Sequence, residues 1–337
     1  NVLNAYPIRS GLEILSSSSA FYYNTNLEVI EEFPPISYIL CGTVSGTFSE
    51  VSLYKKRHAS LKVETSNTGD YEKKLILPLE LPYKKVDSLL SIMTIEEKVG
   101  QMNQYNGFWN VTGPSPKEGN DATKYKHLEQ GLVGSMLNVR GVENVRAVQK
   151  IAVEKTRLGI PLIIGFDVIH GYKTLTPIPL AESASWDLEA IKASARNAAI
   201  EASAEGINWT FAPMVDISRD ARWGRVSEGS GEDTYYGSQV ARAMVRGYQQ
   251  NDLTANNTLL SCVKHFALYG ASEAGRDYNT VDMRRIRMYN EYLPPYKAAI
   301  AAGVGSVMAS FNEIGGVPAI IHRWIDNQID VWVPYSA

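Results

Sequence analysis

The fold is decided by the stretch LLSCVKHFA (residues 259–267), followed by MRRIRMYNEYLPPYKAAIAAG (283–303) and GSVMASFN (305–312). The outer runs are short and apolar, as strands are, and the middle run is long enough for a helix. Earlier in the chain, strand-like runs alternate with helical segments in the same way, at 134–139, 143–159, 161–167, 187–206, 207–213 and 234–250. Five strands buried on both faces and separated by helices are typical of a parallel sheet with right-handed crossovers.

Two architectures fit this alternation: a TIM-like (β/α) barrel and a doubly wound open sheet. An open sheet that binds a nucleotide would carry a glycine-rich phosphate turn after its first strand. Neither G-x-G-x-x-G nor G-x-x-x-x-G-K-[ST] occurs in the sequence. We therefore predict the barrel and expect no nucleotide or other cofactor.

Composition excludes several classes of function. The 33 Lys and Arg residues against 36 Asp and Glu residues give a net charge of −3, which argues against nucleic acid and an anionic membrane as partners. No apolar run approaches the roughly 18 residues of a membrane span. Cys41 and Cys262 are too far apart in sequence to form a C-x-x-C zinc motif, so no metal site is predicted, and Cys262 is expected to be a buried, inert thiol. An uncharged small molecule or oligosaccharide fits best.

The composition changes near Leu81. Residues 1–80 are expected to form an N-terminal extension of unknown role, either β-rich or poorly ordered. Residues 81–337 are expected to form the barrel domain. In that domain, Thr94 followed by Glu97 is a capping-box pattern and predicts the start of a helix.

Polar side chains follow or end the predicted strands. They are Asp167, Asp216, Lys264, His265 and Asn312. Because the reactive groups of such barrels gather at the carboxyl ends of the strands, we expect these side chains to line one mouth.

Four stretches resemble, in the same order, the N-terminal barrel domain of family 3 glycoside hydrolases, especially its bacterial β-glucosidase branch. They are IGFDVIHGYKTLTPIPLAESASWD (164–187), FAPMVDISRDARWGRVSEGSGED (211–233), VKHFALYGASEAGRDYNTVDM (263–283) and LPPYKAAIAAGVGSVMASFNEIGGVPA (293–319). The resemblance extends from about Lys84 to about Ala319. It implies binding of the nonreducing-end glucosyl residue of β-glucosides, in a periplasmic or secreted enzyme.

The resemblance also implies roles for four residues. Asp167 would accept hydrogen bonds from sugar hydroxyls, whereas Arg225, Lys264 and His265 would donate them. Two of the four have a simpler interpretation, because Asp167 could cap the helix that follows and Lys264 could be a surface lysine.

Two nearby residues are expected to be structural. His170 would be a hydrogen-bonded histidine of the fold. Arg222 would form ion pairs with acidic residues close in sequence, namely Glu228, Glu232 or Asp233.

The family reaction is retaining hydrolysis, in which one carboxylate attacks the anomeric carbon and a second group protonates the leaving oxygen. The resemblance places the nucleophilic Asp beyond Ala337 and the acid/base in a following domain, and it transfers neither role to Asp326 or Asp330. We therefore expect an incomplete barrel with impaired catalysis. The uncovered strand edges of this barrel would favour self-association. The alternative is a noncatalytic sugar-binding module or an inactive fragment.

Two other barrel enzymes are alternatives. The N-acetylglucosaminidase branch carries KHFPGHG, whose second histidine is the acid/base, but this chain has KHFALYG with Tyr269 at that place. A phosphate-binding aldolase would use Lys264 as a Schiff base. The β-glucosidase branch is favoured over both.

Overall fold

The computed structural model describes residues 81–107, 119–322 and 325, together with the backbone of six strands within the first 80 residues. Side chains are described from Val86 onward. Cys41, Asp326 and Asp330 lie outside the described residues, so expectations about them stay predictions.

The chain forms two compact units, one in Asn1–Ile92 and one in Met93–Val333. Helix α1 (Leu81–Ile92) is grouped with the N-terminal unit. The expected division into residues 1–80 and 81–337 stays a prediction.

The described strands of the N-terminal unit form two antiparallel sheets. Strands β1 to β4 form one sheet in sequence order, and β5 pairs with β6. The strands are β1 (Val2–Ile8), β2 (Gly11–Ser16), β3 (Ala20–Tyr23), β4 (Val29–Phe33), β5 (Phe48–Ser52) and β6 (Lys62–Thr65). These strands agree with the β-rich alternative for the first 80 residues.

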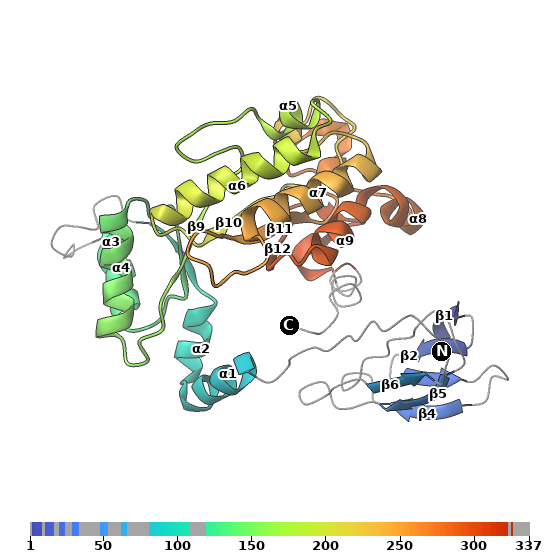
Figure 1. Ribbon diagram of the computed structural model, residues 1–337, viewed down its shortest axis with the longest axis horizontal. Coiled ribbons are helices and arrows are strands. Elements are labelled where there is room, and N and C mark those ends of the chain that lie inside the picture. The colour runs from blue at the N-terminus through green and yellow to red at the C-terminus, as the bar shows by residue number, and fades with distance from the viewer. Residues whose placement is uncertain are drawn as a thin grey trace. The chain divides into compact units, whose positions relative to one another are not determined.

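The second unit is built around a six-stranded sheet in the order β12-β11-β10-β9-β8-β7 (Figure 1). All neighbouring strands are parallel. The strands are β7 (Gln104–Asn106), β8 (Ser135–Leu137), β9 (Ile163–Phe166), β10 (Trp209–Thr210), β11 (Leu260–Phe266) and β12 (Ser306–Ala309). The predicted TIM-like α/β class with parallel strands is thus confirmed, and β7 is an additional strand whose polar residues gave no apolar run.

Helices connect these strands. They are α2 (Ile95–Gln101), α3 (Gly119–Glu129), α4 (Val142–Lys155), α5 (Pro179–Ser183), α6 (Leu188–Ala204), α7 (Thr234–Gln249), α8 (Arg285–Arg287) and α9 (Pro294–Ala301). The predicted capping box begins α2: Glu97 N donates to Thr94 Oγ1 at 3.2 Å, and Thr94 N donates to Glu97 Oε2 at 2.9 Å. Within the described residues, no helix combines the length and the apolar character that crossing a bilayer requires.

Helix α7 packs between α6 and α9 along the sheet (Figure 1). Gly247 on α7 permits the close approach to α6, because a Cβ atom there would lie 2.6 Å from the Lys192 carbonyl oxygen and 2.7 Å from Ala195 Cβ. Small residues facing each other in this way let the two helix backbones pack closely.

One predicted helix is broken. Residues 283–303 form α8, a π-helical turn η4 (Met288–Tyr292) and α9, rather than one continuous helix. The cause is the pair Pro294–Pro295, which begins α9. Proline has no amide hydrogen and clashes with the preceding turn, but it is well suited to the first turn of a new helix.

Burial differs along the sheet. In β11 the residues from Ser261 to Phe266 are all buried, as predicted for a strand covered on both faces. In β12 every residue is half-buried, so two-sided burial was wrong for this strand. Its only paired neighbour among the described strands is β11, which leaves β12 at an edge of the sheet.

Candidate functional site

Four residues predicted to bind substrate lie at or just beyond the carboxyl ends of the central strands. Asp167 follows β9, Lys264 and His265 lie in β11, and Arg225 lies in the 3₁₀ helix η1 (Gly224–Glu228) after β10. We call Asp167, Arg225, Lys264 and His265 the polar cluster. Parallel strands end at the same edge of a sheet, which is why side chains so far apart in sequence meet here.

Lys264 and Asp167 form an ion pair across two strands. Nζ of Lys264 lies 2.8 Å from Oδ1 of Asp167. The Lys264 side chain is 4% exposed, whereas the Asp167 side chain is 51% exposed. The ammonium group is therefore buried with its counter-ion at its side, and the carboxylate keeps accessible oxygen surface with which to accept further hydrogen bonds.

His265 is held by a buried network. Its backbone N and its Nδ1 both lie 2.9 Å from Oδ2 of Asp216. The hydroxyl of Tyr296, on α9, lies 2.7 Å from Oδ1 of Asp216 and 2.7 Å from the carbonyl oxygen of His265. Asp216 thus fixes the orientation of the imidazole through Nδ1, so that Nε2 is the ring nitrogen left to meet a ligand.

Arg225 is clamped by Glu228. Its Nε and one terminal nitrogen donate to the two carboxylate oxygens at 2.6 and 2.8 Å, a bidentate geometry. The guanidinium carbon also lies 5.5 Å from the centroid of the Tyr269 ring, a cation–π contact. These contacts hold the guanidinium plane in a fixed position.

Tyr269 is locked in turn by Asp277. Its hydroxyl donates to Oδ1 of Asp277 at 2.6 Å, and Nε1 of Trp223 donates to the same oxygen at 2.9 Å. The ring of Tyr269 is buried and lies 5.1 Å from the ring of His265, centroid to centroid. Tyr269 therefore contacts two members of the polar cluster.

Glu228 interacts electrostatically with Arg225, Lys264 and His265. Burial works to raise the pKa of Glu228, but the hydrogen bonds and charge of Arg225 outweigh it and hold that pKa below its ordinary value of 4.5. The charges of Lys264 and His265 contribute in the same direction. Glu228 thus lies within electrostatic reach of three members of the polar cluster.

The structure rules out the two simpler interpretations of Asp167 and Lys264. Asp167 caps neither of the next two α-helices, because Ile178 precedes α5 and Asp187 is the N-cap of α6. Lys264 is not a surface lysine, since it is buried. Both side chains are instead engaged with each other.

Three further expectations can be compared with the contacts. Nδ1 of His170 lies 3.3 Å from the carbonyl oxygen of Thr176, a bond within the loop after β9. Arg222 pairs with Asp220, not with the acidic residues expected for it, because Asp220 is two positions away and Glu228 is engaged by Arg225. Asn312 donates to the carbonyl oxygen of Ala267 at 3.4 Å, a contact with the backbone after β11.

Sequence reasoning missed the residues that support the polar cluster. They are Glu228, Asp277, Tyr296 and Tyr269, whose supporting role was not predicted. Glu228 could have been found, because three residues after Arg225 is the spacing of neighbours on one helical turn. Asp277 and Tyr296 belong to a loop and a helix whose place is set by the tertiary fold.

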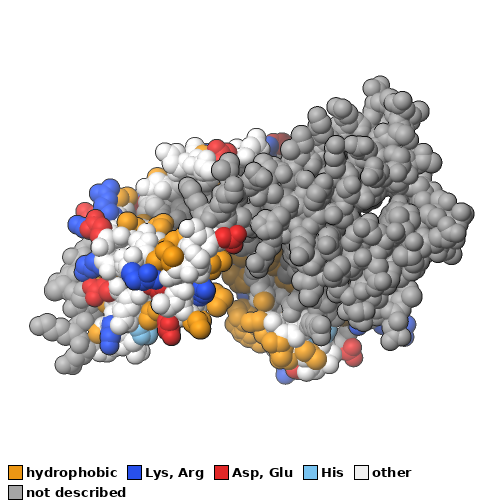
Figure 2. All heavy atoms as spheres, turned by 90° about the horizontal axis from the view of Figure 1, so that it is seen from below, with side chains coloured by type: hydrophobic (Ala, Val, Ile, Leu, Met, Phe, Trp, Pro, Cys, Tyr) orange, Lys and Arg blue, Asp and Glu red, His pale blue; other side chains and the backbone are white. Residues whose placement is uncertain are grey.

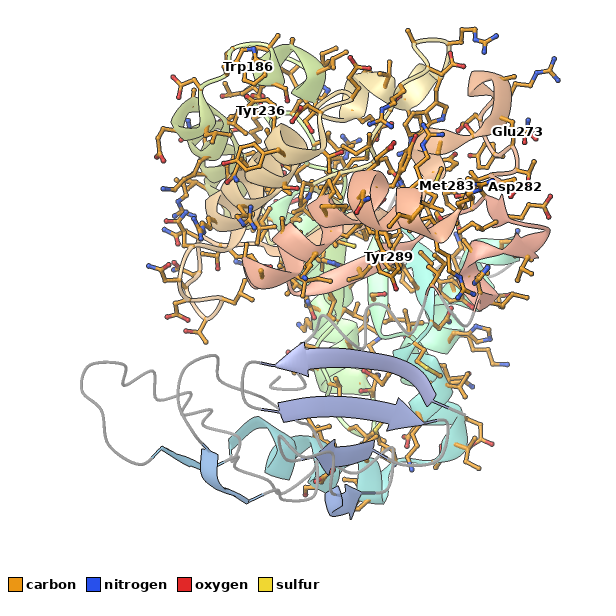
Figure 3. All side chains as sticks on the ribbon, turned by 90° about the vertical axis from the view of Figure 1, so that its right-hand side faces the viewer. Trp186, Tyr236, Glu273, Asp282, Met283 and Tyr289 are labelled. Carbon is orange, nitrogen blue, oxygen red and sulfur yellow. The ribbon has the colours of Figure 1, made fainter. Side chains whose placement is uncertain are left out.

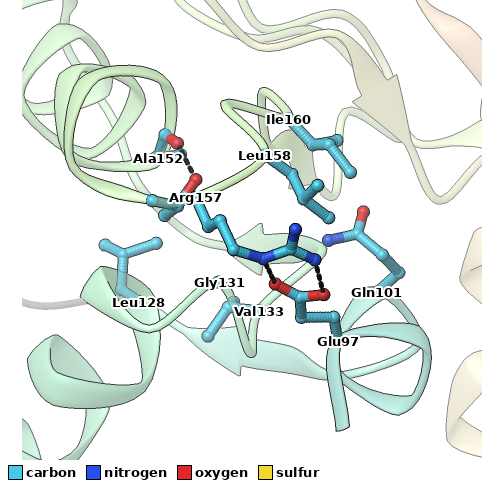
Figure 4. A pocket seen from close by; sticks show the side chains of 10 residues that line it. Glu97, Gln101, Leu128, Gly131, Val133, Ala152, Arg157, Leu158 and Ile160 are labelled. Carbon is cyan, nitrogen blue, oxygen red and sulfur yellow. Dashed lines mark hydrogen bonds and ion pairs between the residues drawn. The ribbon is translucent and has the colours of Figure 1, made fainter. Parts of the chain in front are cut away.

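Two hollows lie elsewhere. One holds only about 10 Å³, beside the bidentate pair of Arg157 and Glu97, which leaves room for about one water molecule (Figure 4). The other is a groove of about 360 Å³ at the amino ends of β9, β10 and β11. Neither includes a member of the polar cluster.

Among the described residues, one face of the molecule carries charges of both signs. Figure 2 shows lysine and arginine side chains interspersed with aspartate and glutamate on one face, beside a group of hydrophobic side chains. A mixed surface of this kind fits an uncharged ligand better than a polyanion.

Comparison with known proteins gives a consistent picture. Residues 94–329 match the model of the Glycosyl hydrolase family 3 N terminal domain. The chain is 41% identical over 250 residues to a periplasmic beta-glucosidase of Salmonella typhimurium, covering 73% of this chain and 32% of that protein.

Solved structures are similar as well. The crystal structure of a beta-glucosidase from Listeria innocua in complex with glucose has 40% identity and a TM-score of 0.67, covering 75% of this chain and 36% of that one. A mutant of the Listeria innocua enzyme in complex with laminaribiose has 41% identity and a TM-score of 0.69, with the same coverage. The chain spans about a third of the length of the Salmonella typhimurium relative.

Proposed function

The chain belongs to glycosyl hydrolase family 3, and we propose that its parallel α/β domain binds the nonreducing-end glucosyl residue of β-glucosides through the polar cluster. The observation that carries this proposal is the Lys264–Asp167 ion pair at the mouth of the sheet. It places a donor and an acceptor side by side, which is what vicinal sugar hydroxyls require.

The remaining members of the polar cluster support the same role. Arg225 is held rigidly by Glu228, and His265 by Asp216. Rigid donors discriminate between sugars, because a hydroxyl that is absent or inverted leaves a buried polar group without its partner. We expect selectivity for the glucose configuration.

The reaction of the whole protein would be retaining hydrolysis of an O-glycosidic bond. That chemistry needs two carboxyl groups on opposite sides of the bond. Asp167 and Glu228 are each engaged by a cation, so we assign them to binding and positioning. The four stretches that match the family supply binding residues and no nucleophile, so we expect the 337-residue chain alone to bind glucosides with little turnover.

The experiment that tests this function combines binding and turnover. Calorimetry with glucose is expected to show saturable binding that Asp167→Asn weakens at least about 10-fold, since a buried charged group loses its partner. Incubation with an aryl β-glucoside is expected to give little product. Turnover that Asp167→Asn abolishes would contradict the impaired catalysis, and absence of glucose binding would contradict the function itself.

A noncatalytic sugar-binding module is the second candidate. It is favoured by the same contacts, which bind without carrying out a bond-breaking step. Glucose binding without hydrolysis, in a protein that includes all family segments, would establish it.

Two further proposals concern context. The name of the Salmonella typhimurium relative supports a periplasmic or secreted compartment. The half-buried edge strand β12 supports self-association, because an uncovered edge offers unpaired backbone groups to another chain. Concentration-dependent sedimentation of the purified chain tests the second of these.

A further inference from the structure

A groove lies at the end of the sheet that is opposite the polar cluster. It holds about 360 Å³ and is formed at the amino ends of β9, β10 and β11, together with the end of α6 and the loop before β11. The polar cluster lies at the carboxyl ends of the same strands. The volume is at the lower end of the roughly 300–1,000 Å³ that small-molecule sites occupy.

Four apolar side chains line the groove. They are Ile163, Ile207, Leu253 and Leu260. Ile207 is buried, whereas Ile163 and Leu253 are 43% and 45% exposed. Apolar side chains that stay exposed along a groove offer contact area to a ligand that has an apolar body.

The lining carries no charge. Among the described residues that line the groove, none has an ionisable side chain, and the polar side chains are the amides of Asn208 and Asn256 and the hydroxyls of Ser203 and Thr258. A charged ligand would lose hydration here without gaining a counter-ion. The groove therefore fits a neutral ligand.

Asn208 presents an oriented hydrogen-bond donor. Its backbone N donates to the Ile164 carbonyl oxygen at 3.1 Å, and its own carbonyl oxygen accepts from Leu260 N at 2.9 Å. Its side-chain Oδ1 accepts from Ile164 N at 2.8 Å, which identifies the oxygen of the amide and fixes its plane. Within the described part of the chain, no group accepts a hydrogen bond from Nδ2 of Asn208. This nitrogen is left to donate to a ligand.

The loop that forms one wall of the groove is fastened to the fold. Nη1 of Arg196, on α6, donates to the carbonyl oxygen of Asn257 at 2.6 Å. Within the loop, Oγ1 of Thr258 donates to the carbonyl oxygen of Ala255 at 2.8 Å. A wall held in this way is formed before a ligand arrives, as is usual for small-molecule sites.

We propose that this groove binds a neutral small molecule that combines an apolar body with a hydrogen-bond acceptor, such as a carbonyl oxygen. The apolar body lies against Ile163, Ile207 and Leu253, and the acceptor meets Nδ2 of Asn208. This site goes beyond the function proposed above and does not depend on it, because no member of the polar cluster lines the groove.

The test uses three probes that share a phenyl ring and differ in charge: acetophenone, benzoate and benzylammonium. They are titrated into the 337-residue chain with isotope-labelled isoleucine and leucine methyl groups, followed by NMR. Acetophenone is expected to shift the signals of Ile163, Ile207 and Leu253 saturably. It should bind at least about 5-fold more tightly than either charged probe, since neither finds a counter-ion.

Two variants examine the two halves of the proposed ligand. Asn208→Asp keeps Oδ1 as the acceptor for Ile164 N and replaces the donor with a carboxylate oxygen. Acetophenone affinity should then fall at least about 5-fold, and benzylammonium should become the tighter ligand. Leu253→Ala shortens a half-exposed side chain, which the fold tolerates, and should weaken acetophenone binding about 3-fold or more.

Trp186 provides the matched control. It is 69% exposed, and its ring lies 4.3 Å from that of Tyr236, centroid to centroid (Figure 3). Neither residue lines the groove. Trp186→Ala removes a larger exposed apolar side chain than Leu253→Ala does, so it should reduce acetophenone binding only if the probe adheres to exposed rings in general.

Several results would overturn the site. They are equal affinity for the three probes, no binding of acetophenone, and shifts confined to methyl groups outside the groove. Acetophenone binding that neither Asn208→Asp nor Leu253→Ala weakens would overturn it as well, and so would a loss in Trp186→Ala as large as that in Leu253→Ala. A change of preference from acetophenone to benzylammonium in Asn208→Asp would support it most directly.

Discussion

Lys264 Nζ lies 2.8 Å from Asp167 Oδ1, and this contact joins the ends of β11 and β9, two strands that are not neighbours in the sheet. The two partners are unequal, because the ammonium is buried and the carboxylate is half exposed. Removing either partner therefore has different consequences for stability.

Asp167→Ala should destabilise the domain more than Lys264→Met. Loss of the carboxylate leaves a buried ammonium without its counter-ion, which costs about 1–3 kcal/mol when some water can still reach the site. Loss of the ammonium leaves a carboxylate that is already half solvated, and the cost should stay below about 1 kcal/mol. Urea unfolding of both variants and of the double variant measures the difference. An equal or larger cost for Lys264→Met would contradict this assignment.

Asp277 should act on sugar binding through Tyr269 and Arg225. Asp277→Ala removes the acceptor of two buried donors and frees the Tyr269 ring, so glucose affinity should fall about 10-fold. Asp277→Asn keeps an oxygen at the same place and should retain affinity within about 3-fold. A loss of equal size in both variants would show that the charge of Asp277, rather than its hydrogen bonds, is what matters.

The Arg225–Glu228 pair predicts a pH dependence of stability. Because Arg225 holds the pKa of Glu228 below its ordinary value of 4.5, the stability from this pair is fully present above that pH. It is lost as the pH falls through the lowered pKa of the folded state. The difference in unfolding free energy between wild type and Glu228→Gln should therefore shrink between roughly pH 6 and pH 3. A difference that stays constant over this range would refute the linkage.

Cys262 should be unreactive in the folded protein. The thiol is buried in β11, and burial raises its pKa to about 11. In a Cys41→Ser background, a thiol reagent should label the native chain at least about 100-fold more slowly than the urea-unfolded chain. Rapid labelling under native conditions would mean that β11 opens readily.

Much of the fold could be predicted from the sequence because its signals are local. The capping box at Thr94 and Glu97 and the apolar run of β11 depend on neighbours in the chain. Strand β7 was missed because it contains polar residues, and the break in 283–303 was missed although Pro294 and Pro295 mark it. The half-burial of β12 could not be predicted from the sequence, because burial depends on which strands and helices lie beside it in the fold.

The candidate site could also be predicted only in part from the sequence. The four members of the polar cluster were found from the ends of strands and from motif resemblance, and the structure brings Asp167 to Lys264. The pairing of Arg225 with Glu228 was assigned to the wrong arginine, because several acidic residues lie near both in sequence. Asp277 could not be predicted, since its contacts depend on how the loop after β11 returns to Trp223.

The central claim is that the polar cluster forms one site for a single glucose ring. Calorimetric titration of the 337-residue chain with glucose and with galactose tests it most directly. The account predicts saturable 1:1 binding of glucose, at least about 10-fold weaker binding of galactose, and loss of the glucose signal in Asp167→Asn. Equal heats for the two sugars, or glucose binding that survives Asp167→Asn unchanged, would contradict it.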